Sequence, residues 1–184
     1  MASRDLKDLV AAASDKALIV QQACREAGGF DLLIYCTLRS LEEQARLYRQ
    51  SRSRSEINAK MDKLSSRGFD YLARIIESVG PCYGRHVTNA APGESWHNYG
   101  EAWDAVPLID GKPAWNYLQA KAHWDAYGEA VRQAGMNWAG DWTGFREYPH
   151  AQLKPGGNPL KTMGPEEIKH AFLDRKLIQP EMIA

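Results

Sequence analysis

The residue types best suited to chemistry lie in the stretch from residue 95 to residue 104, SWHNYGEAWD. His97 and Asp104 stand seven residues apart in it, with Gly100 between them where the chain can turn sharply. Imidazole and carboxylate groups are both good ligands for a borderline-soft divalent metal such as zinc. The same pattern also fits a turn aspartate beside a surface histidine, and this stretch alone does not separate the two interpretations.

The segment after the glycine, residues 102–106, has the composition of a strand and ends before Pro107. Alternation along a strand would place Asp104 on one face together with Ala102 and Val106. A carboxylate that faces inward is costly unless it is paired or binds a metal ion. The predicted strand therefore favours a partner for Asp104.

A second stretch, residues 140–152, supplies further candidates. His150 could be a third protein ligand, which leaves the fourth position of a tetrahedral zinc site to water, the open arrangement of a catalytic site. Glu147 precedes it by three residues and could act as general base on that water. Because Pro149 disfavours a helix here, we expect a bend or the start of a strand that turns both groups inward.

These motifs, S-x-H-x-x-G-x-A-x-D followed by E-x-P-H, resemble the zinc peptidases that cut D-amino-acid bonds in bacterial peptidoglycan. That family includes D-alanyl-D-alanine carboxypeptidases and the L-alanyl-D-glutamate endopeptidases of bacteriophage endolysins. The endolysins are the nearer resemblance, because residues 87–93, VTNAAPG, lead into the first motif as they do there. The similarity runs from about Leu33 to Gln152. One departure is Glu147, where these endopeptidases usually carry aspartate.

The resemblance implies one catalytic zinc ion on His97, Asp104 and His150, with Glu147 as the catalytic base. It implies hydrolysis of the L-alanyl-D-glutamate bond of the peptidoglycan stem peptide by water that the metal activates. Two alternatives stay open: a D-alanyl-D-alanine carboxypeptidase, whose relatives carry glutamate at the Glu147 position, and a non-catalytic zinc-containing module that binds the cell wall.

The same resemblance places Arg39 and Gln44 in the substrate cleft, since both match an R-S-x-x-E-Q segment after a strand. A guanidinium group suits a substrate carboxylate or a developing oxyanion, so Arg39 is a catalytic candidate. A surface salt bridge at a helix entry is the alternative for Arg39, and simple solvation is the alternative for Gln44. Ser95 could bind substrate or orient His97, or it could cap a turn.

Length and composition bound the remaining expectations. At 184 residues, with 44% hydrophobic and 25% charged residues, the chain fits one soluble domain. Zero formal net charge gives no general attraction to nucleic acid or membrane, and we expect a monomer without stable membrane insertion. The N-terminus lacks a signal-peptide pattern, so we expect synthesis in the host cytoplasm and action on the wall after release, with the help of a holin-type partner. Three cysteines without C-x-x-C pairing indicate reduced thiols of the core.

The elements predict an α+β fold in which helices flank a small antiparallel sheet that carries the zinc ligands. We expect a single peptidase domain over residues 1–184. Its parts are a catalytic core at about 30–153, a helical insertion at about 50–80 and a short helical tail at 154–184. Helical periodicity covers residues 5–27 and 114–134, the latter with Trp115 and Leu118 among its packing residues. Residues 109–112 read as a hairpin loop. Four tryptophans near the motifs could floor a cleft or fill the core: Trp96, Trp103, Trp138 and Trp142.

Overall fold

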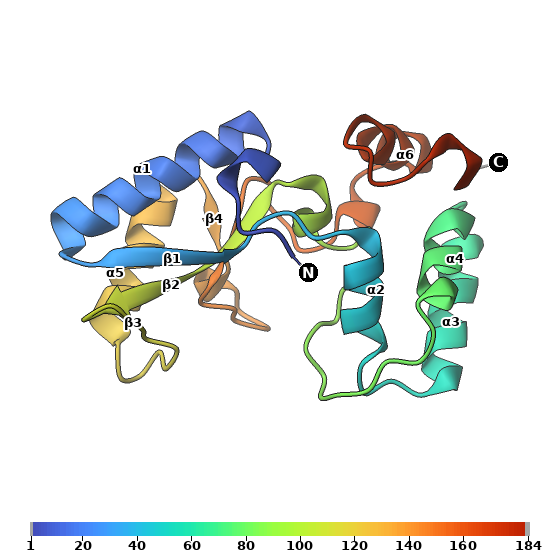
Figure 1. Ribbon diagram of the computed structural model, residues 1–184, viewed down its shortest axis with the longest axis horizontal. Helices are drawn as coiled ribbons and strands as arrows, with labels where there is room; N and C mark the ends of the chain where they lie inside the picture. The colour runs from blue at the N-terminus through green and yellow to red at the C-terminus, as the bar shows by residue number, and fades with distance from the viewer. Residues whose placement is uncertain (1, 183–184) are drawn as a thin grey trace. The chain divides into compact units, whose positions relative to one another are not determined.

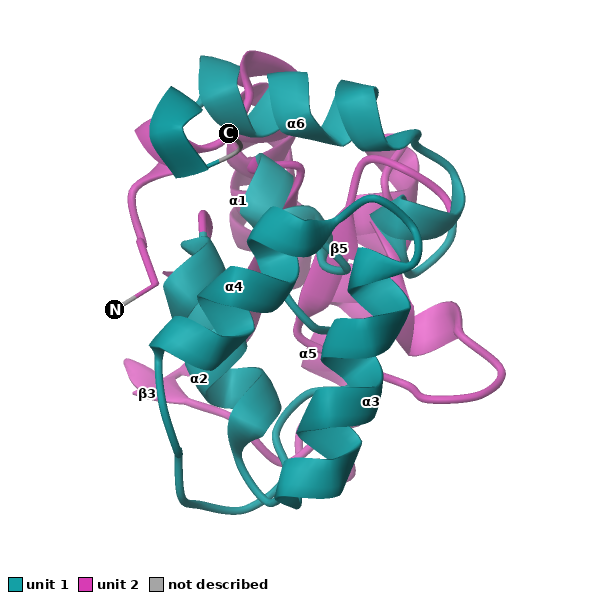
Figure 2. Cartoon of the chain, turned by 90° about the vertical axis from the view of Figure 1, so that its right-hand side faces the viewer, with its two compact units in different colours: residues 1, 39–99, 156–184 teal, residues 2–38, 100–155 magenta. Residues whose placement is uncertain are grey.

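The computed structural model describes residues 2–182 of the chain. These residues form two units, which Figure 2 shows in different colours. Unit 1 comprises residues 39–99 and the chain from residue 156 onward, and unit 2 comprises residues 2–38 and 100–155. His97 therefore belongs to unit 1, whereas Asp104, Glu147 and His150 belong to unit 2.

Unit 2 contains a five-stranded antiparallel sheet, in which β1, β2, β5 and β4 lie in that order and β3 pairs with β2 (Figure 1). The strands are β1 (Asp31–Cys36), β2 (Ala102–Ile109), β3 (Lys112–Pro113), β4 (Asn137–Trp138) and β5 (His150–Gln152). The predicted small antiparallel sheet of an α+β fold is confirmed. The long strand β2 joins the other strands, because it pairs with β1, β3 and β5.

The predicted hairpin joins β2 to β3. Ile109 and Lys112 are register partners, so only two residues form the loop. Both of them have positive φ angles, 51° at Asp110 and 73° at Gly111. This is the backbone that two-residue hairpins favour, and the Asp-Gly dipeptide accommodates it readily.

Two helices of unit 2, α1 (Ala11–Gly28) and α5 (Lys121–Gln133), contact each other and the sheet (Figure 1). The predicted apolar stripe of α1 is buried, and it consists of Ala13, Ala17, Val20 and Cys24. Burial raises the pKa of the Cys24 thiol to about 12, so this cysteine is an inert part of the core, as predicted. Two short 3-10 helices complete the unit, η1 (Leu6–Asp8) and η3 (Ala139–Asp141).

The prediction of a helix from residue 114 is wrong, because α5 begins only at Lys121. The Asn116 side chain accepts a hydrogen bond from the Gln119 amide, which stabilises a turn in place of a helix. Trp115 and Leu118, which the periodicity assigned to packing, are 59% and 82% exposed. Local side-chain hydrogen bonding thus overrides an apolar repeat that extends too far toward the N-terminus.

Unit 1 is built from helices, two of which have serine side chains as caps at their starts. Ser40 caps α2 (Leu41–Arg49), and Ser53 with Glu56 forms a capping box on α3 (Arg54–Ser65). The other elements are α4 (Asp70–Ser78), η2 (Trp96–Tyr99), η4 (Pro159–Lys161), α6 (Pro165–Asp174) and η5 (Pro180–Met182). The 50–80 segment is helical as predicted, since it contains α3 and α4. Among the described residues, no helix has both the length and the apolar character that crossing a membrane requires.

Candidate metal centre

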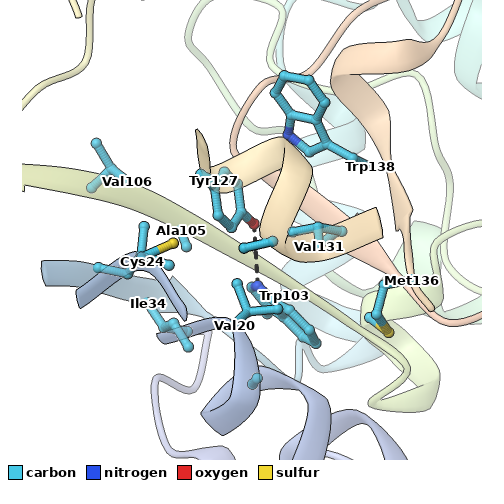
Figure 3. Packing of buried hydrophobic residues seen from close by; sticks show 14 of the residues in the cluster. Val20, Cys24, Ile34, Trp103, Ala105, Val106, Tyr127, Val131, Met136 and Trp138 are labelled. Atoms are coloured by element: carbon cyan, nitrogen blue, oxygen red, sulfur yellow. Dashed lines mark hydrogen bonds between the residues drawn. The ribbon is translucent and has the colours of Figure 1, made fainter. Parts of the chain in front are cut away.

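Along β2, side chains alternate between the apolar face of the unit 2 sheet and the face that carries Asp104. Trp103 and Ala105 belong to the hydrophobic core, which also contains α1 and α5 residues (Figure 3). Because side chains alternate along a strand, Asp104 lies on the opposite face. His150 on β5 is the register partner of Asp104, so the two side chains lie next to each other on that face. The predicted strand thus gives Asp104 a partner.

A β-bulge brings a third candidate ligand to the same row. Ile34 pairs with Ala105 on the core face, but Cys36 pairs with Asp104, so β1 has one extra residue at this point. The Cys36 sulfur lies within 4.8 Å of an Asp104 carboxylate oxygen. Cys36 is buried but lies outside the hydrophobic cluster that contains Cys24. The sequence analysis grouped both as core thiols, because a bulge has no signal in this sequence.

Both ring nitrogens of His150 are directed at oxygen atoms. Nδ1 lies 3.1 Å from Asp104 Oδ1, and Nε2 lies 2.9 Å from Gln152 Oε1. The Gln152 amide nitrogen donates to the Lys154 carbonyl, which turns its oxygen toward the imidazole. His150 Nε2 therefore carries the proton and donates to Gln152. In the neutral imidazole, Nδ1 then presents a lone pair directly to the carboxylate.

This arrangement requires a cation between Nδ1 and the carboxylate, because two acceptors in contact repel each other. Burial lowers the pKa of His150, but the Asp104 carboxylate outweighs that effect and the pKa is raised. A proton can therefore supply the positive charge. A divalent metal ion can supply it as well, and histidine ligands typically donate their other N–H to an oxygen, as His150 does to Gln152. The residues present fit a zinc ion bound through Asp104 and His150 Nδ1.

Glu147 and His150 are the ends of a tight turn, which confirms the predicted bend around Pro149. The His150 amide donates to the Glu147 carbonyl at 3.1 Å, and the Glu147 amide donates to the Ala139 carbonyl at 3.2 Å. The Glu147 charge is near enough to contribute to the raised pKa of His150. Glu147 is half-buried, whereas His150 is 7% exposed. Asp141, another carboxylate of the 140–152 stretch, forms an ion pair with Arg132.

Hydrogen bonds from the core hold the next two carbonyls of this turn. Trp138 Nε1 donates to the Tyr148 carbonyl at 2.7 Å. The Pro149 carbonyl accepts from the Ala105 amide and from the Tyr127 hydroxyl, each at 3.0 Å. Burial raises the pKa of Tyr127 well above its usual value, so its hydroxyl keeps its proton and donates. The core therefore determines where His150 and Glu147 lie.

In unit 1, the backbone of Arg39 is tied to the segment that carries His97. The Arg39 amide donates to the His97 carbonyl at 3.1 Å, and the Asn98 side chain donates to the Arg39 carbonyl at 2.8 Å. Arg39 Nη1 donates to Gln44 Oε1 at 2.9 Å, while Gln44 donates to the Ala90 carbonyl. His97 is only 2% exposed, so it is not a surface histidine.

Gln44 is fully buried, and its contacts orient the Arg39 guanidinium; that it binds substrate remains a prediction. Ser95 is half-buried, and its carbonyl accepts the Asn98 amide at the start of η2. Three of the four tryptophans considered for a cleft floor are buried: Trp96, Trp103 and Trp138. Gln152 and Asn98 are the polar residues that the sequence analysis missed. Only the position of Gln152, two residues after His150 on a strand, could have indicated it.

Comparison with known proteins confirms the resemblance to the zinc D-alanyl-D-alanine carboxypeptidase and L-alanyl-D-glutamate endopeptidase family. Residues 88–153, which contain both motifs, match the family model described as D-alanyl-D-alanine carboxypeptidase.

A curated relative is the peptidoglycan L-alanyl-D-glutamate endopeptidase CwlK of Bacillus subtilis (strain 168). It is 31% identical over 133 residues, or 69% of this chain. The chain spans 63% of the length of that relative. The crystal structure of the Serratia marcescens L-Ala D-Glu endopeptidase ChiX covers 84% of this chain and 89% of its own, with 18% identity and a TM-score of 0.45.

We predict that Tyr127→Phe lowers the free energy of unfolding by about 1–3 kcal/mol. The fully buried Trp103 Nε1, which lies 3.2 Å from the Tyr127 hydroxyl, would lose its acceptor (Figure 3). Denaturant unfolding measures the change. Tyr83→Phe is the matched control, because Tyr83 is 89% exposed and its loss should change stability by less than about 0.5 kcal/mol. Equal stabilities of the two variants would show that the hydrogen bonds of the Tyr127 hydroxyl do not stabilise the fold.

Proposed function

We propose that this chain is a zinc-dependent peptidoglycan peptidase. The observation that carries the proposal is the pair formed by His150 Nδ1 and the Asp104 carboxylate, 3.1 Å apart, with Nε2 committed to Gln152. Such a pair suits a metal ion, and it lies in the segment that matches the peptidase family. The name of the relative CwlK supports peptidoglycan as the substrate.

Three residues would hold the ion in this proposal: His97, Asp104 and His150. A bound zinc ion polarises a carbonyl group and lowers the pKa of a coordinated water toward about 7. His97 and Asp104 are separated by six residues that include Gly100, whose φ angle of 65° gives the sharp turn expected there. With three protein ligands, one position stays open for water or substrate, as in catalytic zinc sites.

The remaining chemistry belongs to side chains of this chain. Glu147 accepts a proton from the attacking water and delivers it to the leaving amine, for which its position in the turn before His150 is suited. Arg39 binds a substrate carboxylate or the developing oxyanion, and Gln44 restricts the orientation of its guanidinium. Ser95, which lies two residues before His97, contributes its hydroxyl group to substrate binding.

We propose the L-alanyl-D-glutamate bond of the stem peptide as the bond that is cut. The relative CwlK supports this choice through its name, and residues 87–93 support it through their resemblance to endolysins. That resemblance also supports the role of a phage endolysin that reaches the wall with a holin-type partner. The second candidate is a D-alanyl-D-alanine carboxypeptidase, which the description of the matching family model favours.

Purified protein should contain about one zinc ion per chain, and a chelator should abolish hydrolysis until zinc is restored. His150→Ala should lose both the metal and the activity, because it removes a ligand and leaves the Asp104 carboxylate without its partner. Elemental analysis and dye release from labelled peptidoglycan measure the two properties. Activity that is unaffected by chelation in protein free of transition metals would contradict the zinc proposal.

Digestion of purified peptidoglycan should release fragments with a new D-glutamate N-terminus and leave L-alanine on the glycan. Mass spectrometry of the fragments identifies the bond, and the release of free D-alanine instead would establish the carboxypeptidase alternative.

Cells whose inner membrane is permeabilised should lyse when they produce the protein, whereas intact producing cells should not. Lysis that is independent of permeabilisation would refute the need for a holin-type partner.

Glu147→Ala should fold and retain zinc but lose at least about a hundredfold in rate, because general-base assistance is typically worth about 10²–10⁴-fold. Glu147→Asp should keep part of the activity, since the resembling endopeptidases carry the shorter carboxylate. Rates of peptidoglycan hydrolysis and the zinc content separate these effects. A wild-type rate in Glu147→Ala would remove the residue from the mechanism. If the wild type binds zinc and peptidoglycan but cuts neither bond, it is a wall-binding module.

A further inference from the structure

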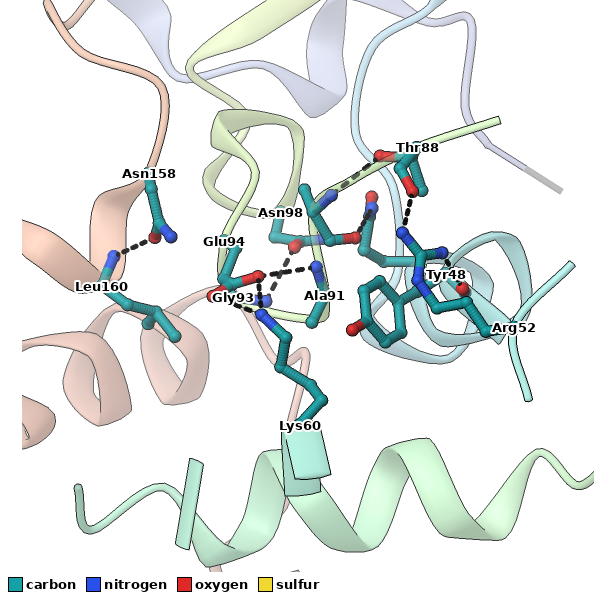
Figure 4. Close-up of polar contacts among 12 residues, drawn as sticks. Tyr48, Arg52, Lys60, Thr88, Ala91, Gly93, Glu94, Asn98, Asn158 and Leu160 are labelled. Atoms are coloured by element: carbon teal, nitrogen blue, oxygen red, sulfur yellow. Dashed lines mark hydrogen bonds and ion pairs between the residues drawn. The ribbon is translucent and has the colours of Figure 1, made fainter. Parts of the chain in front are cut away.

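An ion pair joins the helical 50–80 segment to the loop that leads to His97. Lys60 lies on α3, and its ammonium group is 2.9 and 3.0 Å from the two carboxylate oxygens of Glu94 (Figure 4). Glu94 stands three residues before His97 in the chain. The two side chains are only 19% and 10% exposed, so water screens this pair less than an ordinary surface ion pair.

The Glu94 carboxylate also closes the loop of residues 91–94 on itself. It accepts a hydrogen bond from the Ala91 amide at 2.9 Å, while the Glu94 amide donates to the Ala91 carbonyl, also at 2.9 Å. Burial raises the pKa of Glu94, but Lys60 and the Ala91 amide outweigh this effect and the pKa is lowered. The carboxylate is therefore charged at neutral pH, and Lys60 is the cation that compensates it.

Two further contacts connect this loop to the segment with His97, and Figure 4 shows the one between Gly93 and Asn98. The Gly93 amide donates to Asn98 Oδ1 at 3.0 Å, and the Tyr99 hydroxyl donates to the Gly93 carbonyl at 3.0 Å. Asn98 in turn donates to the Arg39 carbonyl. Position 93 requires glycine, because its φ angle is 82° and a Cβ atom there would lie 2.8 Å from a Leu72 methyl carbon.

We propose that Lys60 is a positioning residue for His97, through which the 50–80 segment sets the metal affinity of the site. This inference rests on the proposed function, because it takes His97 to be a zinc ligand. A displaced Glu94 would open the 91–94 loop and loosen the bonds from Gly93 to Asn98 and Tyr99. His97 lies between Glu94 and Asn98 in the sequence, so its backbone would no longer be held in place. Loss of partners that orient a ligand typically weakens metal binding 10–100-fold.

The test compares zinc dissociation constants, measured by competition with a chromophoric chelator on folded, metal-free protein. Lys60→Met removes the charge and keeps the aliphatic chain, and it should weaken zinc binding at least about tenfold. Lys60→Arg should restore binding to within about threefold of the wild type, since arginine can pair with the same carboxylate. Lys63→Met is the matched control on the exposed side of the same helix and should bind zinc as the wild type does.

A second variant keeps the inference testable if Lys60→Met does not fold. Glu94→Gln retains an acceptor for the Ala91 amide and removes only the charge, so it should also bind zinc more weakly. If Lys60→Met and Glu94→Gln bind zinc as tightly as the wild type, the ion pair only stabilises the fold and the inference is wrong, even where the melting temperature falls. If the wild type itself binds no zinc, the proposed function fails instead.

Discussion

Two acceptor groups in contact, His150 Nδ1 and the Asp104 carboxylate, are the constraint on which the candidate site depends. His150 is buried and the Asp104 side chain is 15% exposed, and Gln152 holds the imidazole proton on the opposite nitrogen. A buried carboxylate beside a lone pair is stable only when a positive charge lies between them. A proton and a metal ion can each supply that charge, so they compete for one place. Metal binding at this pair must therefore release a proton wherever His150 is charged, and the affinity for zinc must fall as the pH falls.

The sheet of unit 2 satisfies this constraint because its apolar side chains and the Asp104–His150 pair lie on opposite faces. Trp103 and Ala105 face the helices, while Asp104 between them must face the other way, together with its register partner His150. The same core then fixes the turn before His150, because Tyr127 and Trp138 donate to successive carbonyls of residues 148 and 149. Residues of the core thus determine the position of His150 through hydrogen bonds to the backbone of the preceding turn. The bulge in β1 places Cys36 opposite Asp104. A thiol, which is a softer ligand than the imidazole and carboxylate groups of the motifs, therefore lies next to the site.

The sequence was sufficient for those features that depend on local patterns. Alternation around Asp104, the Asp110-Gly111 hairpin and the bend at Pro149 each follow from the conformational preferences of a few adjacent residues. The predicted start of helix α5 at residue 114 was wrong, because the Asn116 side chain stabilises a turn that an apolar repeat cannot reveal. Gln152, Asn98 and the register of Cys36 were missed because their roles depend on which residue lies opposite, and pairing between distant segments leaves no mark in one sequence. The roles of Arg39 and Gln44 follow from family resemblance, and those of His97 and Ser95 follow from residue type and position in the first motif.

The two units hold their candidate residues in physically different ways. In unit 2, backbone ladders between strands fix Asp104 and His150, so the geometry is a property of the sheet itself. In unit 1, His97 lies in a one-turn 3-10 helix, and side chains bonded to backbone groups fix the segment around it: Asn98, Tyr99, Gln44 and Glu94. Each such bond depends on one side chain, whereas a ladder survives most substitutions. Variation in metal affinity should therefore arise more readily from substitutions around His97 than from substitutions around Asp104. The contact between Lys60 and Glu94 differs from those bonds, because it joins two oppositely charged side chains rather than a side chain and a backbone group.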